Sequence, residues 1–193
     1  MVGEIVEGAL ATLKRLDEKR IAEIHKRFQE PRMYYTAGLR KPPQLKSLRE
    51  DLIDEMLWVW EIFPEGKDKA TGYAGIVTYS GPPFVFVYFF DGKDDLEMAR
   101  DVLVQLAQGF FKESDEEQLW FYLMRPIKPE IHDMLVEGGF DPYEDDVLPG
   151  IDLKKEAAYR MERHTWAAYY GAESGETYEA GEEDDDDPHE LEF

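Results

Sequence analysis

The segment 84–90, FVFVYFF, constrains the fold more than any other part of the chain. It is apolar on both faces, which is typical of a central strand that helices cover on both sides. A helical pattern begins near Asp94, only a few residues after the strand. The sequence therefore predicts an α/β domain in which this strand lies inside the sheet and turns directly into a helix.

The junction after this strand is acidic. A helix that follows a strand commonly binds phosphate, because its first N–H groups and its positive end point at the ligand. Here Asp91, Asp94, Asp95 and Glu97 stand against a single Lys93. Repulsion between two like charges about 4 Å apart is about 1 kcal/mol in water and about 4 kcal/mol at an effective dielectric near 20. We therefore expect a helix that is capped by its own carboxylates and binds no anion.

The chain is strongly acidic, with a formal net charge of −21 over 193 residues. Segment 172–193 contributes eleven acidic residues and no Lys or Arg, so we expect one domain over 1–171 and an acidic tail over 172–193. An acidic body disfavours binding to nucleic acid or to an anionic membrane. The chain has no cysteine, which fits a cytoplasmic protein, and its longest apolar run is too short to span a bilayer.

Hydrophobic periodicity predicts six strands and four helices, with weak strand or loop at 141–150 and a mixed loop at 32–43. The expected strands are 9–16, 57–63, 70–79, 84–90, 118–124 and 157–166. The expected helices are 17–31, 44–56, 94–112 and 128–137. With the weak strand included, the order is β-α-α-β-β-β-α-β-α-β-β.

This order resembles the GCN5-related N-acetyltransferase (GNAT) fold, and local sequence is similar to the branch that acetylates ribosomal-protein N-termini. The opening ATLKRLDEKRIAEIHKRFQEPR resembles the start of that branch, and GYAGIVTY resembles its third strand. MLVEGGFDP and AAYRMERHTW resemble its last helix and closing strand. The similarity covers about residues 9–166. It implies a mixed, mostly antiparallel central sheet flanked by helices.

The resemblance also implies an acetyl-CoA site. Family members hold the diphosphate with a Gln/Arg-x-x-Gly-x-Gly/Ala loop, whose glycines let the backbone approach the phosphates. In this chain the loop departs from the pattern, with Asp91, Asp94 and Leu96 at the three motif positions. The cofactor-binding segment implied by the resemblance is Phe89, Phe90, Asp91, Gly92, Lys93, Asp94, Asp95 and Leu96. We therefore expect no cofactor, or acetyl-CoA if the protein is active.

The expected catalytic groups are also sparse. Many family members use a Tyr on the helix after the fifth strand as a proton donor, and the matching residue here is Leu135. Tyr88 is the one titratable group on the predicted central strand and is our catalytic candidate. The four histidines are far apart in sequence and lack any metal-ligand spacing, so we expect no metal site.

Aromatic residues beyond the last predicted strand suggest a segment that docks on a protein. The partner could be basic, or the segment could serve self-association. The candidate partner-binding residues are Tyr169, Tyr170, Tyr178, Asp184, Asp185, Asp186 and Asp187. Their acidic surroundings favour solvated chain over a metal site.

Two functions follow from these observations. The first is a catalytically degenerate acetyltransferase-fold protein that acts as a structural or protein-binding component. Proteins of this fold also occur in bacteriophage particles, so the inside of a virus particle is an alternative to the cytoplasm. The second is an active acetyl-CoA-dependent N-acetyltransferase, for which an acidic protein would favour a basic amine or a protein N-terminus.

Overall fold

The computed structural model describes most of the chain up to residue 174. The described residues are 5–16, 18–37, 39, 41–54, 56–78, 81–91, 95–144, 148 and 151–174, with the backbone alone for 18 and 171–174.

An eight-stranded sheet in the order β1-β2-β3-β4-β5-β6-β8-β7 forms the centre of the described structure. Its strands are β1 Ile5–Glu7, β2 Ala11–Arg15, β3 Leu57–Pro64, β4 Gly72–Val77, β5 Phe84–Phe89, β6 Gln118–Met124, β7 Asp141–Pro142 and β8 Glu156–Glu162. Neighbouring strands are antiparallel, except that β5 and β6 are parallel. This confirms the expected mixed, mostly antiparallel sheet.

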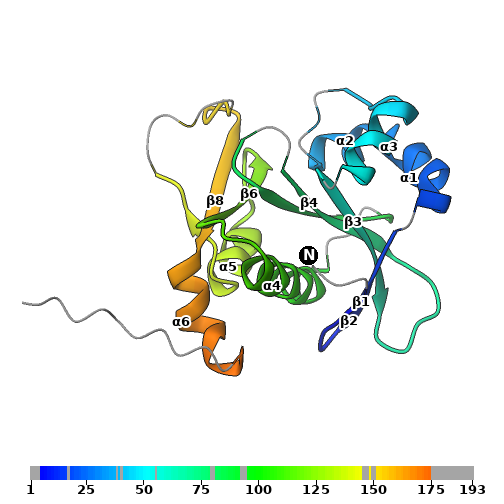
Figure 1. Ribbon diagram of the computed structural model, residues 1–193. Coiled ribbons are helices and arrows are strands. Elements are labelled where there is room, and N and C mark those ends of the chain that lie inside the picture. Colours follow the sequence, from blue (N-terminus) through cyan, green and yellow to red (C-terminus); the bar gives the residue numbers. More distant parts are fainter. Residues whose placement is uncertain are drawn as a thin grey trace, which may run out of the picture.

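Helices cover both faces of the sheet (Figure 1). A 3-10 turn at Glu18–Arg20 leads into α1 Ile21–Phe28, α2 Pro31–Thr36 and α3 Leu45–Ile53, which lie on one face. The other face carries α4 Leu96–Glu113, α5 Pro129–Glu137 and α6 Arg163–Ser174. Each face encloses its own hydrophobic core, so the sheet has two buried sides, as its central strand predicted.

The apolar segment 84–90 is confirmed as an internal strand. Five of the six residues of β5 are buried, and only Val87 is half-buried. Phe86 and Tyr88 pack into the core under α1–α3, whereas Val85 and Phe89 pack into the core under α4–α6. The alternation places successive side chains on opposite faces.

Two segments were predicted wrongly, and one strand was not predicted. Segment 32–43 contains α2, because Pro31 occupies the first helical position after an extended Glu30, a common start for a helix. The strand predicted over 157–166 ends at Glu162, and the chain then forms α6. This helix buries Trp166 in the hydrophobic core. The sequence also gave no sign of β1, which has only three residues.

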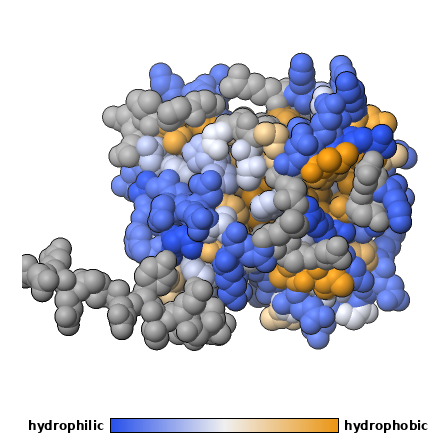
Figure 2. All heavy atoms as spheres, viewed as in Figure 1, coloured by the Kyte–Doolittle hydropathy of each residue, from blue (hydrophilic) through white to orange (hydrophobic). Residues whose placement is uncertain are grey.

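The surface seen in Figure 2 is mainly hydrophilic, with separate hydrophobic patches. Large apolar side chains that remain exposed include Ile5, Leu45, Ile53 and Met56. Leu45 and Met56 lie near the two ends of the helix predicted over 44–56, which is α3, ends at Ile53 and buries only Leu48.

Candidate functional site

The two parallel strands at the middle of the sheet separate after a single paired position. Phe84 pairs with Trp120, and the N–H of Trp120 donates to the Pro83 carbonyl over 2.9 Å. No further β5–β6 pair occurs in the described ladder. The carboxyl-terminal halves of β5 and β6 therefore leave an opening in the sheet.

A cleft of about 400 Å³ occupies this opening. Its wall includes Phe86 and Tyr122 from the core under α1–α3, and Leu103 and Met134 from the core under α4–α6. Because residues from both cores line one cleft, the cleft lies in the gap between the strands and reaches both faces of the sheet. Most of its wall is apolar.

Peptide groups of β5 face this cleft. The N–H of Phe90 donates to the Thr71 carbonyl over 2.9 Å, so even-numbered positions of β5 point their peptides toward β4. The peptides of Val87 and Phe89 consequently point toward β6 and the cleft. An extended ligand with amide groups can pair with such a strand edge. Of the predicted backbone contacts, Phe89 faces the cleft, although its carbonyl already accepts a hydrogen bond from Arg32, and the N–H of Phe90 is occupied within the sheet.

The start of α4 is capped by its own residue. Asp95 is the N-cap, and its carboxylate accepts a hydrogen bond from the Met98 N–H over 3.1 Å. Leu96, the next residue, is half-buried and lines the cleft. Asp91 is exposed, whereas Gly92, Lys93 and Asp94 lie outside the described residues. A carboxylate thus already satisfies one of the N–H groups that a phosphate would use.

Tyr88, the catalytic candidate, lines the cleft and is 3% exposed. Its hydroxyl donates to Glu30 Oε2 over 2.8 Å, and Arg27 Nη1 lies 3.0 Å from the other oxygen of that carboxylate. Burial and this hydrogen bond raise the pKa of Tyr88 above its usual value. The hydrogen bond from Tyr88 and the charge of Arg27 lower the pKa of Glu30.

Two neighbours of Tyr88 were missed by the sequence analysis. Glu30 lies at the end of the helix predicted over 17–31, and Arg32 begins the loop predicted over 32–43. Arg32 Nη1 donates to the Phe89 carbonyl over 3.1 Å, and its guanidinium lies 5.1 Å from the centre of the Tyr88 ring. The short helix α2 therefore brings one cation to the cleft and one carboxylate to Tyr88. The Pro31 start of α2 was the available signal.

Leu135, which the resemblance aligns with a catalytic Tyr, is fully buried in α5. It belongs to the core under α4–α6 and does not line the cleft, whereas its neighbour Met134 does. The described residues of α5 therefore present no proton donor to the cleft.

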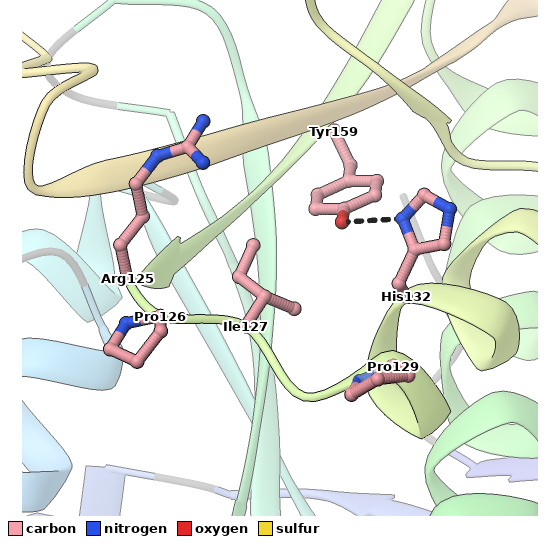
Figure 3. Close-up of a pocket in the computed structure, with 6 residues that line it drawn as sticks. All are labelled: Arg125, Pro126, Ile127, Pro129, His132 and Tyr159. Carbon is pink, nitrogen blue, oxygen red and sulfur yellow. Dashed lines mark hydrogen bonds between the residues drawn. The ribbon is translucent and has the colours of Figure 1, made fainter.

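A second, larger hollow of about 760 Å³ lies beside the loop between β6 and α5 (Figure 3). Across it, Arg125 stands opposite His132 and Tyr159, whose ring nitrogen Nδ1 and hydroxyl are 2.9 Å apart. Arg125 Nε donates to the carbonyls of Leu153 and Glu156. These contacts join loops and strands of the domain, so we assign the hollow a structural role and place the candidate site at the cleft.

The tyrosines proposed to bind a partner differ in their surroundings. Tyr169 is 64% exposed on α6, whereas the Tyr170 hydroxyl donates to the Gly138 carbonyl over 3.3 Å. Burial raises the pKa of Tyr170. Tyr178 and Asp184, Asp185, Asp186 and Asp187 lie outside the described residues. The partner-binding role of this set stays a prediction.

The described part of the chain offers no cluster of three or more His, Asp or Glu side chains able to hold a metal ion. Over the same residues, none of the helices has the length and apolar character needed to cross a bilayer.

Comparison with known proteins gives similarity in structure only. No family model and no characterised protein sequence matches the chain. Spermidine N-acetyltransferase from Vibrio cholerae, solved with CoA and spermine, superposes with a TM-score of 0.60 at 10% identity, over 81% of this chain and 98% of that one. An acetyltransferase from Agrobacterium tumefaciens gives a TM-score of 0.60 at 17% identity, over 84% and 96%.

RimL, a ribosomal L7/L12 α-N-protein acetyltransferase solved with coenzyme A, gives a TM-score of 0.57 at 11% identity, over 82% of this chain and 98% of that one. These identities are too low to transfer an activity. The alignments cover 96–98% of each of these three structures. The chain therefore has the fold of the GNAT acetyltransferases.

Proposed function

We propose that the protein is an acetyl-CoA-dependent N-acetyltransferase that binds the pantetheine arm of the thioester in the cleft between β5 and β6. The observation that carries this proposal is the separation of the two strands after one paired position. It leaves the peptides of Val87 and Phe89 beside an apolar cleft. The pantetheine arm is an extended chain with two amide groups, which matches a strand edge.

In such a reaction the nitrogen of an amine attacks the thioester carbonyl carbon, the C–S bond breaks, CoA leaves as a thiolate that takes up a proton, and the nitrogen loses a proton. The cleft supplies apolar walls that exclude water from the thioester. Tyr88 lines the cleft, and its hydroxyl donates over 2.8 Å to the carboxylate of Glu30, which lies outside the cleft lining. A proton-transfer role for Tyr88 is part of the proposal.

The diphosphate of CoA fits the described residues less well than its pantetheine arm. Asp95 occupies the Met98 N–H and places a negative charge at the start of α4. We therefore expect the pantetheine arm to contribute most of the affinity, and the diphosphate to contribute less than the glycine-rich loop of the family would provide.

A second candidate is the catalytically degenerate component predicted from the sequence, with a structural or protein-binding role and a virus particle as one place of action. The Asp95 cap and the buried Leu135 favour it, because they stand where the family usually has a diphosphate-binding loop and a Tyr proton donor. We rank this candidate second because it does not explain the open cleft between β5 and β6.

Isothermal titration calorimetry with acetyl-CoA and with S-acetyl-pantetheine separates the two candidates. The enzyme proposal expects saturable binding of both compounds. Ala99→Leu, which adds side-chain volume to the cleft wall, should weaken binding of both, whereas Ala22→Leu on the exposed side of α1 should not. Absence of binding at millimolar concentration of either compound would favour the non-catalytic component.

A further inference from the structure

The cleft has a narrow end, where the two parallel strands part. Phe84 and Trp120 form the single β5–β6 pair of the described ladder. Two positions farther along each strand come Phe86 and Tyr122, and both line the cleft. The peptides proposed to bind the pantetheine arm lie nearer the end of β5, from which the chain leads to α4. Phe86 and Tyr122 therefore stand at the narrow end of the opening.

This geometry determines the direction of a bound thioester. In the proposed complex the diphosphate of CoA lies near the start of α4, at the wide end of the cleft. A pantetheine arm that runs inward along the peptides of Phe89 and Val87 carries its sulfur toward the narrow end. The thioester consequently comes to the level of Phe86 and Tyr122.

Departure of CoA places a negative charge on this sulfur, which a hydroxyl could stabilise. Within the described part of the chain, the cleft-lining residues with a hydroxyl are Tyr35, Thr36, Tyr88 and Tyr122. The Thr36 hydroxyl donates to the Arg32 carbonyl over 2.8 Å, and the Tyr88 hydroxyl donates to Glu30. Tyr35 is 57% exposed. Tyr122 is thus the half-buried member of this set whose proton is not already donated.

The ring of Tyr122 is held by its neighbours. It stacks on Trp120 with ring centres 6.2 Å apart and lies edge-on to Phe84 with ring centres 5.3 Å apart. None of the described residues forms a hydrogen bond with its hydroxyl. Burial, with a smaller effect of Glu156, raises the pKa of Tyr122 to about 12, so the hydroxyl keeps its proton at neutral pH. A neutral donor on a packed ring therefore lies at the narrow end of the cleft.

We propose that Tyr122 is a catalytic residue whose hydroxyl donates a hydrogen bond to the sulfur of the thioester and stabilises the CoA thiolate as it leaves. As the C–N bond forms, the electron pair of the C–S bond passes to sulfur, and Tyr122 retains its own proton. The released thiolate takes a proton from water, which balances the proton lost by the nitrogen. A donor placed where charge develops in the transition state accelerates such a step.

This inference rests on the proposed function. It supplies a donor from β6 in a chain that has Leu135 at the position of the family's Tyr.

Binding of CoA and of desulfo-CoA, which lacks the thiol, isolates the contact with sulfur. Calorimetry of the full chain at pH 7 and at pH 9.5 compares the neutral thiol with the thiolate, since a thiol such as that of cysteine ionises at about pH 8.5. At pH 9.5 the wild type should bind CoA about tenfold more tightly than desulfo-CoA, because a hydrogen bond to a charged acceptor is stronger than one to a neutral acceptor. At pH 7 this preference should be smaller.

Tyr122→Phe keeps the ring and removes the donor. It should abolish the preference for CoA at pH 9.5 and leave the affinity for desulfo-CoA unchanged. Tyr169→Phe, on the exposed side of α6 and outside the cleft lining, should change neither quantity. The other ionisable side chains that line the cleft, Arg32, Tyr35 and Tyr88, are the same in all three proteins, so their titration affects both ligands alike. Thermal denaturation at both pH values verifies that each variant is folded.

Two results would overturn the role of Tyr122 and leave the CoA site intact: equal affinity of the wild type for the two compounds at pH 9.5, or an undiminished preference in Tyr122→Phe. The first comparison uses only the wild type, so it decides the question even if the variant does not fold. Absence of binding of both compounds at millimolar concentration would overturn the proposed function and the inference with it.

Discussion

The hydroxyl of Tyr88, at the centre of the sheet, donates a 2.8 Å hydrogen bond to Glu30 at the start of α2. The two residues are 58 positions apart in sequence. The bond connects the strand that borders the cleft to the helix that carries Arg32. It therefore links the start of α2 to the core of the domain.

This hydrogen bond should make stability depend on acid pH. The folded-state pKa of Glu30 is lower than that of an unfolded glutamate, about 4.3, chiefly because Tyr88 donates to its carboxylate. The ionised carboxylate consequently adds stability above that pH, and the contribution is lost as the pH falls through the lower folded-state pKa. Melting temperatures of the wild type and Glu30→Gln should differ at pH 7 and converge near pH 3.

Tyr88→Phe is the matched test, because it removes the donor and keeps the ring. Its melting curve should lose part of the same acid dependence. If the difference between wild type and Glu30→Gln stays constant from pH 7 to pH 3, the bond does not shift the pKa of Glu30.

Asp95 should oppose CoA binding while it stabilises α4. Asp95→Ala should lower the free energy of unfolding by about 1 kcal/mol, the usual cost of losing an N-cap. Asp95→Asn keeps a capping oxygen but removes the charge. It should tighten CoA binding about fivefold, because a like charge about 4 Å away costs about 1 kcal/mol in water.

Calorimetry with CoA measures the change in CoA affinity of Asp95→Asn. Asp133→Asn, on the exposed side of α5, is the control for the change in net charge. Equal affinities for the wild type and Asp95→Asn would mean that this carboxylate does not face the diphosphate.

Gly8 gives the chain room to pass over α4. A Cβ at this position would lie 1.6 Å from Gln105 Nε2 and 2.7 Å from Asp101 Oδ2. Gln105 is buried and donates to Asp101, which accepts the Leu10 N–H over 3.0 Å. Gly8→Ala should therefore lower the free energy of unfolding by about 1–3 kcal/mol, measured by urea denaturation.

Truncating the side chain that the new methyl group meets should relieve the clash. The loss in the double variant Gly8→Ala/Gln105→Ala should be smaller than the sum of the two single losses. Simple additivity would show that the clash with Gln105 is not the cause.

Arg163, the first residue of α6, binds backbone carbonyls at the C-terminal end of α4 and just beyond it. It donates to the carbonyls of Phe111 over 2.8 Å and Glu116 over 3.0 Å, and also to that of Ser114. Lysine cannot reproduce this planar fork, so Arg163→Lys should lower the free energy of unfolding by about 1–3 kcal/mol. Urea denaturation measures the loss.

Arg100→Lys is the control, since Arg100 makes an exposed ion pair with Glu137 and should cost little. A loss of the same size in both variants would show that the fork of Arg163 contributes nothing beyond its charge.

Local sequence was sufficient for the elements with strong periodicity. Phe84–Phe89 alternates between two cores and reads as an internal strand, and the acidic start of α4 reads as a self-capped helix, which Asp95 forms. Such features depend on residues only a few positions apart, so they can be predicted from the local sequence. The resemblance to the GNAT fold followed from the order of these elements.

The sequence by itself thus determined the class of fold, the central strand and the acidic turn beside it. Only the tertiary structure decided which side chains meet at the cleft. Glu30 reaches Tyr88, and Arg32 and Tyr122 line the cleft from α2 and β6. Their convergence depends on how the helices pack on the sheet and on where β5 and β6 part, and these are long-range contacts that no local pattern of residues encodes.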